Sequence, residues 1–378
     1  MRLFPREAFD IPPGVAHLCA GGEPPWLRSH AEALTRYGAH RNAGWDGRLQ
    51  QSGEVERVRA LFATAWAVPT DDIGFVSSVA EGCGMLGESL DLPPGSNVVA
   101  ADIEYSSMLG GFALRPGLEL RLADGLASIP AQVDANTRVI LVSDISQLTG
   151  EAADLPALRA LADRVGAALV VDFTQAAGWK QVRPSVADFA FSSCYKWLLA
   201  TTGIAVAYWN QARQPDWAPH SAGWFSLKMP PSGPIDWQAP QLVPGAMRFC
   251  RGNPAFVPLY MLGHAVDTAA GWATPVALEA HVHGLATAFR AGVLDAQLPC
   301  MTPPAHGANV CLPHPASEAM VAALHARGVM AWGGRGRVRF SFHGYNDMDD
   351  VDFGLAALRQ AWRLPLQPMV GNTTPASR

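Results

Sequence analysis

Short apolar runs alternate with stretches of helical periodicity from about residue 54 onward, and this alternation restricts the fold more than any other feature. Several of the runs are continuously apolar, which is typical of strands that helices cover on both faces. Helical patterns such as residues 154–165 lie between many of them. The alternation predicts an α/β layered domain with a mostly parallel sheet. The expected strands span residues 73–77, 97–101, 138–143, 167–172, 187–192 and 203–208.

The pattern changes after residue 255. We expect a large α/β domain over residues 16–255 and a smaller α+β domain over residues 256–364, which the N-terminal residues 1–15 join. The polar, proline-rich residues 365–378 are expected to form a disordered tail. In the smaller domain, helical patterns are expected at 256–271, 275–291, 317–327 and 348–362, with one strand at 338–342.

The composition argues against several classes of function. The formal net charge is -5, so neither nucleic acid nor an anionic membrane surface is an expected partner. No apolar run reaches the length of a membrane span, and the first residues lack the apolar stretch of a signal peptide. Six scattered cysteines without a CxxC pair indicate reduced thiols, so the cytoplasm is the expected location. His281 and His283 are two apart on an expected helix and face different sides, so no metal site is predicted.

Lysine is rare in this chain. Of the 28 basic residues, only Lys180, Lys196 and Lys228 are lysines. Arginine cannot act as an amine nucleophile, because its guanidinium stays protonated. Each lysine is therefore a candidate for chemistry that arginine cannot perform.

The segment around Lys196 carries the strongest chemical signal. Asp172 ends an expected buried strand, Gln175 lies in the turn that follows, and Lys196 comes after the next strand. A lysine amine can form an imine with the aldehyde of pyridoxal 5'-phosphate (PLP), and a carboxylate can keep the pyridine nitrogen protonated. The Gln175 amide can donate to the ring phenolate oxygen, while the hydroxyls of Ser193 and Tyr195 can reach the phosphate.

Each of these residues also has a simpler interpretation. Taken alone, Asp172 is more often a cap of a turn, and Lys196 is more often a surface lysine. The whole set in this order favours cofactor chemistry instead. The segment therefore predicts a PLP enzyme that acts on the Cα bonds of an amino acid through a Lys196 imine.

The same residues resemble the class V aminotransferase family of fold-type I PLP-dependent enzymes, which includes kynureninases, isopenicillin N epimerase-like proteins and cysteine desulfurases. The resemblance spans roughly residues 50–360. It implies a large domain with a mostly parallel seven-stranded sheet and a smaller C-terminal α+β domain. The family pattern, a strand with Asp-x-x-Gln and then a strand with Ser-x-(His/Tyr)-Lys, matches Asp172, Gln175, Ser193, Tyr195 and Lys196.

The resemblance also implies further cofactor contacts. It places the PLP phosphate on the backbone amides of Val79 and Ala80 at the start of a helix, and Tyr105 against the ring. Gln147 stands where the family often has an asparagine that contacts the phenolate oxygen. Asn253 lies in a loop that reaches the phosphate across a dimer interface in the family, so a homodimer is expected.

A substrate-binding residue is implied near the C-terminus. Residues 338–346 match the family signature Arg-x-Ser followed by Tyr-Asn. The arginine of this signature binds the substrate α-carboxylate, a role that suits its planar, two-pronged donor. Arg337 and Arg335 are close enough in sequence to compete for the assignment, and we favour Arg339.

One motif points to a different class of protein. Residues 82–87 read Gly-x-Gly-x-x-Gly, and Asp102 follows Gly82 by twenty residues, as in a dinucleotide-binding fingerprint. The fingerprint needs its first glycine directly after the strand, whereas here the glycines fall inside the expected helix. Close packing between this helix and the sheet explains them better. An NAD-binding oxidoreductase is therefore a distant alternative. A non-catalytic scaffold is also a distant alternative, because the joint presence of Asp172, Gln175 and Lys196 argues against it.

The reaction type is left open by the sequence. Lys196 is the expected base for the substrate Cα proton, and transamination, epimerisation and β-elimination can all follow its removal. Cysteine desulfurase activity is disfavoured, because residues 328–336, where that activity needs a thiol, contain no cysteine. The expected assignment is a class V aminotransferase. A PLP-dependent β-eliminating lyase, either a C–S lyase or kynureninase-like, is the first alternative, followed by an epimerase.

Overall fold

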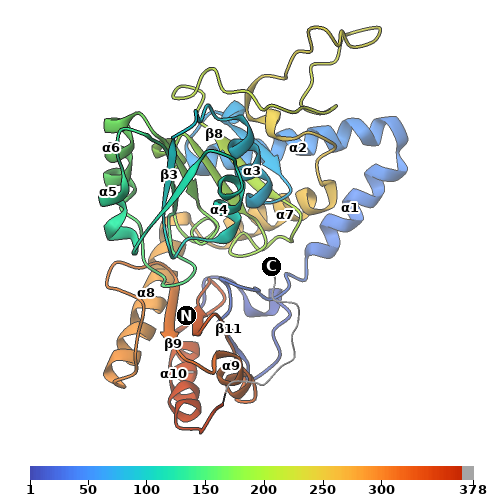
Figure 1. Cartoon of the computed structure of the whole chain (residues 1–378). Coiled ribbons are helices and arrows are strands. Elements are labelled where there is room, and N and C mark those ends of the chain that lie inside the picture. The colour runs from blue at the N-terminus through green and yellow to red at the C-terminus, as the bar shows by residue number, and fades with distance from the viewer. Residues whose placement is uncertain (368–378) are drawn as a thin grey trace. The chain divides into compact units, whose positions relative to one another are not determined.

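The computed structural model describes residues 1–367 and divides the chain into two compact units. The large unit contains residues 29–147 and 152–271. Among the described residues, the small unit contains residues 1–28, 148–151 and 272–367. Each unit has its own sheet (Figure 1).

The large unit is built on a seven-stranded sheet with the order β2-β8-β7-β6-β5-β3-β4. Neighbouring strands are parallel except in the two pairs that involve β8, so β8 alone runs against the others. The expected α/β fold with a mostly parallel seven-stranded sheet is thus confirmed. The strands are β2 (Ile73–Val76), β3 (Asn97–Ala101), β4 (Glu119–Ala123), β5 (Thr137–Ser143), β6 (Ala168–Asp172), β7 (Phe189–Ser193) and β8 (Ala205–Trp209).

Both faces of this sheet are covered. Successive strand residues point to opposite faces, and every residue of β3, β6 and β8 is buried. The core joins strand residues such as Val98 and Phe191 to Leu86 and Phe112 of the covering helices. The helices of this unit are α1 (His30–Asn42), α2 (Gly44–Trp66), α3 (Val79–Ser89), α4 (Ser106–Ala113), α5 (Ile129–Gln132), α6 (Leu155–Val165) and α7 (Phe256–Trp272).

The glycine motif at residues 82–87 lies inside α3 and serves close packing. A Cβ atom on Gly82 would overlap the Phe191 ring of β7, and one on Gly87 would overlap the backbone of Gly111 in α4. Gly84 has open space at the same position. The first and last glycines therefore let α3 approach the sheet and α4, and they do not form the turn that a dinucleotide fingerprint requires.

The small unit contains a three-stranded antiparallel sheet with the order β11-β12-β9. Phe340 of β12 packs against Phe289 of α8. Strand β1 pairs in parallel with β10 and so joins the N-terminal segment to this unit. The elements are β1 (Ala16–His17), α8 (Pro275–Asp295), β9 (Asn309–Pro313), α9 (Ser317–His325), β10 (Val329–Met330), β11 (Trp332–Gly334), β12 (Arg337–Ser341) and α10 (Met348–Trp362).

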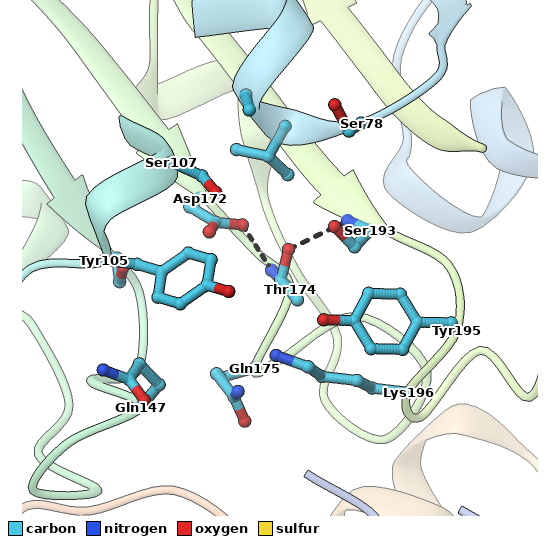
Figure 2. Close-up of a pocket in the computed structure, with 13 residues that line it drawn as sticks. Ser78, Tyr105, Ser107, Gln147, Asp172, Thr174, Gln175, Ser193, Tyr195 and Lys196 are labelled. Carbon is cyan, nitrogen blue, oxygen red and sulfur yellow. Dashed lines mark hydrogen bonds between the residues drawn. The ribbon is translucent and has the colours of Figure 1, made fainter. Parts of the chain in front are cut away.

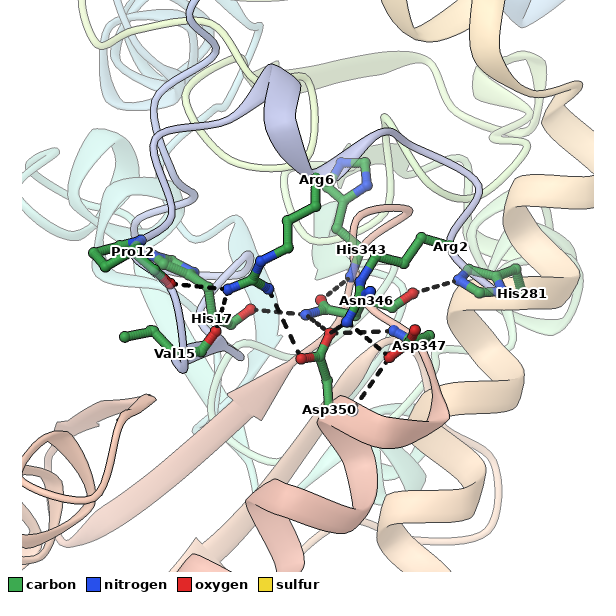
Figure 3. A network of polar contacts seen from close by, with 10 residues as sticks. All are labelled: Arg2, Arg6, Pro12, Val15, His17, His281, His343, Asn346, Asp347 and Asp350. Atoms are coloured by element: carbon green, nitrogen blue, oxygen red, sulfur yellow. Dashed lines mark hydrogen bonds and ion pairs between the residues drawn. The ribbon is translucent and has the colours of Figure 1, made fainter.

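Charged contacts also hold the N-terminal segment at the start of α10 (Figure 3). Asp347 and Asp350 form a capping box at this helix end. The Arg2 guanidinium lies 3.1 Å from the Asp347 carboxylate and 3.5 Å from that of Asp350. The Arg6 guanidinium lies 3.9 Å from Asp350 and donates a hydrogen bond to the backbone oxygen of Pro12 at 3.1 Å. The capping carboxylates therefore bind the first residues of the chain as well as the helix.

The bounds of the two units differ from the domain bounds expected from the sequence. Helix α7 lies in the large unit, because Gly263 packs against Val58 of α2 and Tyr260 hydrogen-bonds with His40 of α1. Residues 16–28 lie in the small unit, where β1 pairs with β10. Most of the expected tail, residues 368–378, is outside the described residues. Within residues 1–367, no helix has both the length and the apolar character needed to cross a membrane.

Candidate active site

The carboxyl ends of three neighbouring parallel strands meet at one edge of the large sheet. Ser143 at the end of β5 pairs with Asp172 at the end of β6, and Asp172 pairs with Phe191 of β7. The loops beyond these ends border a hollow whose empty space, including the solvent at its mouth, is about 560 Å³ (Figure 2). It is lined by Ser78, Val79, Ala80, Tyr105, Ser107, Ser143, Gln147, Asp172, Thr174, Gln175, Ser193, Tyr195 and Lys196.

The hollow brings together all the expected cofactor-binding residues except Asn253. They come from the segments that follow β2, β3, β5, β6 and β7. These strands are parallel, so the segments that leave their carboxyl ends gather at one edge of the sheet. Residues far apart in the sequence therefore face one space.

The Lys196 amine lies close to two tyrosine rings. Lys196 follows β7 and is only 7% exposed. Its Nζ is 5.3 Å from the centroid of the Tyr195 ring and 5.8 Å from that of Tyr105, within the range of cation–π contacts (Figure 2). The amine is therefore held inside the hollow and not in solvent.

Asp172 places a buried carboxylate in the same hollow. It accepts a hydrogen bond from the backbone N–H of Thr174 at 2.8 Å, and the Thr174 hydroxyl accepts one from the backbone N–H of Ser193 at 2.8 Å (Figure 2). Burial raises the pKa of Asp172, while the Thr174 hydrogen bonds and the Lys196 charge oppose the increase. A cationic hydrogen-bond donor would stabilise a carboxylate in this environment.

A second buried acid, Glu104, is held against β5. Its carboxylate accepts hydrogen bonds from the Ser143 backbone N–H at 2.8 Å and from the Ser143 hydroxyl at 2.6 Å. Burial raises the pKa of Glu104 to about 7, and the negative charge of Asp172 adds to the increase. Because Glu104 directly precedes Tyr105, these bonds also fix the start of the segment that carries the Tyr105 ring.

The N-terminus of α3 forms part of the lining. The Ser78 hydroxyl caps the helix by accepting a hydrogen bond from the backbone N–H of Glu81 at 3.2 Å. The Glu81 carboxylate in turn accepts one from the backbone N–H of Ser77 at 2.7 Å. The first N–H groups of a helix have no partners within the helix and attract anions. Val79 and Ala80 therefore offer amides suited to a phosphate group.

Two of the expected site residues lie outside this hollow. Asn253 is elsewhere in the large unit, where its side-chain oxygen accepts hydrogen bonds from Arg48 at 2.7 Å and from Trp224 at 3.4 Å. Arg339 is buried on β12 of the small unit and donates a hydrogen bond to the backbone oxygen of Gly21 at 2.8 Å.

Four lining residues have no role among the sequence-based expectations: Ser78, Ser107, Ser143 and Thr174. All four are small hydroxyl residues. Ser78, Ser143 and Thr174 lie at or just beyond the carboxyl end of a parallel strand, and Ser107 lies in the first turn of α4. Such residues are common in loops, so their type alone does not mark them. Their position one to two residues from Val79, Tyr105 or Asp172 would have identified three of the four.

The sheet topology and the site together are those of fold-type I PLP-dependent enzymes. The sequence profile described as aminotransferase class V matches residues 32–353, and the chain belongs to this PLP-dependent family.

Similar proteins include curated kynureninases and solved C–S bond-cleaving enzymes. The kynureninase of Burkholderia mallei (strain ATCC 23344) is 26% identical over 402 aligned residues, which cover 95% of this chain and 93% of the kynureninase. The apo structure of a cysteine desulfurase from Thermococcus onnurineus NA1 has a TM-score of 0.82 and 20% identity, covering 94% of this chain and 96% of its own. A mutant of the cystine C–S lyase C-DES, with glycine linked to its PLP, has a TM-score of 0.84 and 19% identity, covering 94% and 99%. These structures share the fold.

The residues present fit the cofactor of the family. The start of α3 suits a phosphate, the Lys196 amine suits an aldehyde, and the Tyr105 ring offers a flat surface for an aromatic ring. Asp172 gives the sharpest test of the fit. Burial raises the pKa of the Asp172 carboxyl because it disfavours the charged form. A hydrogen bond from a protonated ring nitrogen would stabilise the carboxylate in this position.

Proposed function

We propose that this chain is a PLP-dependent enzyme of the class V aminotransferase family that acts on the Cα of an amino acid, with Lys196 attached to the cofactor. The observation that carries the proposal is the buried Lys196 amine, which lies near the Tyr105 and Tyr195 rings in a hollow shared with Asp172. When bound, PLP supplies an electron sink that stabilises negative charge on the substrate Cα.

The lining residues divide the remaining work. The Asp172 carboxylate would accept a hydrogen bond from the ring nitrogen and so favour its protonated form. Lys196 Nζ would take the proton from the substrate Cα. Tyr105 would pack against the ring, and the amides of Gln147 and Gln175 would donate to the phenolate oxygen. The amides of Val79 and Ala80 and the hydroxyls of Ser193 and Tyr195 would bind the phosphate.

Two residues outside the hollow complete the proposal. Arg339 binds the substrate α-carboxylate with its two-pronged guanidinium. Asn253 is exposed, and it reaches the cofactor phosphate of a neighbouring subunit in a homodimer.

Transamination is the first proposed outcome of Cα proton removal, in line with the family description. A β-eliminating lyase is the second candidate, because curated kynureninases align with 95% of the chain. Epimerisation is a third outcome of the same step. An amino-acid panel that includes L-kynurenine separates them. Keto acid that forms only with an amino acceptor indicates transamination, and keto acid with ammonia and no acceptor indicates β-elimination. Release of alanine and anthranilate from L-kynurenine indicates kynureninase-type cleavage of the Cβ–Cγ bond, and inversion at Cα indicates an epimerase.

Borohydride reduction tests the cofactor attachment. The purified protein is expected to be yellow, and mass spectrometry after reduction should place a pyridoxyl group on Lys196. Lys196→Ala should remove the adduct and abolish turnover, whereas Lys228→Ala, at an exposed lysine, should keep both. Asp172→Asn should retain some cofactor and lose most activity, because a neutral ring nitrogen stabilises the Cα charge poorly. A pyridoxyl group on a different lysine would refute the proposal.

A further inference from the structure

An ion pair between Asp144 and Lys180 joins the loops that follow β5 and β6 in the large unit. The Lys180 amine lies 2.8 Å from each oxygen of the Asp144 carboxylate and donates a hydrogen bond to both. The Asp144 side chain is 2% exposed and that of Lys180 is 27% exposed. A partly exposed lysine therefore binds a buried carboxylate, and neither residue has a role in the proposed function.

Asp144 ties this pair to the edge of the sheet that carries the cofactor hollow. It directly follows β5, and its backbone N–H donates a hydrogen bond to the backbone oxygen of Asp172 at 3.0 Å. Its own backbone oxygen accepts one from the backbone N–H of Ala153 at 2.9 Å. Gln147, three residues further along, lines the hollow. The Asp144 side chain is therefore a fixed point at the start of the segment that carries Gln147.

The segment that carries Gln175 leads directly to Lys180. Gln175 also lines the hollow (Figure 2), and its backbone oxygen accepts a hydrogen bond from the Trp179 indole N–H at 2.9 Å. Gly178 has a φ of +108°, and a Cβ atom on it would overlap the backbone of Trp197, which follows the cofactor lysine. Lys180 therefore ends a closed turn that packs against the lysine segment.

The stability of the fold alone gives a weak reason for this ion pair. Burying a carboxylate costs free energy, and a buried ion pair is often no more stabilising than apolar residues of similar size. An ion pair in a low-dielectric environment does fix geometry, because moving either charge away from its partner is costly. The geometry fixed here is the placement of the Gln147 segment against the Gln175 segment.

We propose that the ion pair between Lys180 and Asp144 positions two contacts of the cofactor. It holds the amides of Gln147 and Gln175 on the phenolate oxygen of PLP, and so determines how strongly the Lys196 imine keeps its proton. Lys180 acts through the glutamines and is a positioning residue. This inference rests on the proposed function, because it requires the cofactor to be attached to Lys196.

The phenolate oxygen links the amides to the imine. A protonated imine shares its proton with this oxygen, and once the proton leaves, the oxygen depends on donors from the protein. Amides that donate to the oxygen therefore favour the deprotonated imine and lower its pKa, and weaker donation raises it. Other titratable groups in or beside the hollow, which stay the same in every variant below, are Tyr105, Tyr195, Asp172 and Glu104.

A pH titration of the cofactor absorbance measures the effect in the holoenzyme. Lys180→Met should raise the midpoint of the absorbance change by about 0.5 to 1 pH unit, the size expected when a hydrogen bond to a charged oxygen weakens. Lys180→Arg can still bind the carboxylate and should restore most of the wild-type value. Lys228→Met removes an exposed charge and should leave the midpoint unchanged. A pair that served only the fold would lower the melting temperature of Lys180→Met without moving the midpoint.

A double-mutant cycle tests whether Lys180 acts through a glutamine amide. Gln175→Ala alone should raise the midpoint. Adding Lys180→Met should then raise it by less than about half of its effect in the wild-type protein, because one of the two amides is already missing. Equal effects in the two backgrounds overturn the inference.

A second double variant separates position from charge. Lys180→Met with Asp144→Asn removes both charges, so no carboxylate is left buried without its lysine. The midpoint should stay raised, because the link between the two segments is lost. A return to the wild-type midpoint would show that the Asp144 charge alone causes the effect, and it overturns the positioning role.

The possible results separate this inference from the proposed function. A Lys180→Met midpoint equal to that of the wild-type protein overturns the inference, and so does a wild-type absorbance that is constant over the pH range in which the protein is folded. If Lys180→Met does not melt cooperatively, the variant that lacks both charges decides, and an unchanged midpoint overturns the inference. The pyridoxyl adduct on wild-type Lys196 is measured before the titration, and its absence refutes the proposed function itself.

Discussion

Glu104 is buried beside the cofactor hollow and accepts hydrogen bonds from both donors of Ser143. Its pKa is raised from 4.5 to about 7 in the folded protein, first by burial. Between these two values the unfolded chain has lost the Glu104 proton while the folded chain still holds it. The unfolded state then binds fewer protons, so the free energy of unfolding falls as the pH rises from about 4.5 to about 7.

Glu104→Gln should remove this pH dependence. The glutamine keeps the shape of the side chain, and its amide oxygen and nitrogen can both bond with Ser143. We compare the free energy of unfolding of the variant with that of the wild-type protein at each pH. This difference should shift in favour of the variant by about 2–3 kcal/mol between pH 5 and pH 8. Denaturant unfolding of both proteins at the two pH values measures the change. A stability difference that is the same at both values would show that Glu104 ionises normally in the folded protein.

The residues of the site differ in how far the sequence identifies them. Asp172, Gln175 and Lys196 are marked by chemistry and spacing within one segment, and they line the hollow as expected. The importance of Glu104 depends on Ser143, which is 39 residues away and reaches it only through the pairing of strands. A single sequence shows which side chains are reactive, but it does not show which distant donors surround them.

Helix α3 allows a test of close packing at the level of an element. Gly82→Ala should destabilise the protein by about 3 kcal/mol, because the new Cβ overlaps the buried Phe191 ring and a packed core cannot make room without strain. Gly84→Ala is the matched control in the same helix. Its Cβ meets open space, so the higher helix propensity of alanine should stabilise the protein by up to about 1 kcal/mol. Thermal unfolding of the two variants measures both effects. Equal shifts for both would contradict the packing assignment.

The start of α10 should control the N-terminal segment. Asp350→Ala removes a partner of Arg2 and Arg6 and half of the capping box, so it should destabilise the protein by about 2 kcal/mol. It should also expose the chain at Arg6 to trypsin. Asp349→Ala, at the exposed neighbouring acid, should change neither property much. Limited proteolysis followed by N-terminal sequencing compares them, and equal cleavage of both variants would refute a role of Asp350 in holding the segment.

The elements themselves were predictable where the apolar pattern is strong. The buried strands β3, β5 and β6 lie within one residue of their expected bounds. Strand β4 (Glu119–Ala123) is absent from the expected set, because it is an edge strand that pairs with β3 alone and is largely accessible to solvent. Its sequence, Glu-Leu-Arg-Leu-Ala, therefore lacks the continuous apolar run that marks a buried strand.

At the scale of the whole molecule, the chain crosses between its units more often than the sequence indicates. Residues 148–151 belong to the small unit, where the backbone oxygen of Thr149 accepts a hydrogen bond from the Thr302 hydroxyl at 2.7 Å. Gly150 has a φ of +78° there, and a Cβ on it would lie 2.5 Å from the Asn309 backbone oxygen. No local pattern marks such an excursion, since it is defined by contacts with residues about 150 positions later.

The proposed homodimer makes a prediction that depends on which subunit supplies Asn253. Asn253→Ala alone should weaken PLP binding about fivefold to tenfold, as the loss of one hydrogen bond would. In a heterodimer of Asn253→Ala and Lys196→Ala chains, purified through two different tags, one site combines the intact Lys196 of one chain with the intact Asn253 of the other. If Asn253 acts across the interface, this heterodimer should show about half the wild-type activity at limiting PLP, although the Lys196→Ala parent is inactive and the Asn253→Ala parent is depleted of cofactor.

Two results of that experiment would count against the proposal. If the heterodimer is no more active than the mean of the Asn253→Ala and Lys196→Ala homodimers, Asn253 acts at the site of its own subunit or at neither site. Failure to recover any doubly tagged species from coexpressed chains would refute the dimer itself. Because Asn253 is bonded to Arg48 within its own chain, Arg48→Ala offers a further comparison. It removes one of the two hydrogen bonds to the Asn253 side chain and keeps the side chain itself. A heterodimer of Arg48→Ala and Lys196→Ala chains should therefore show about half the wild-type activity.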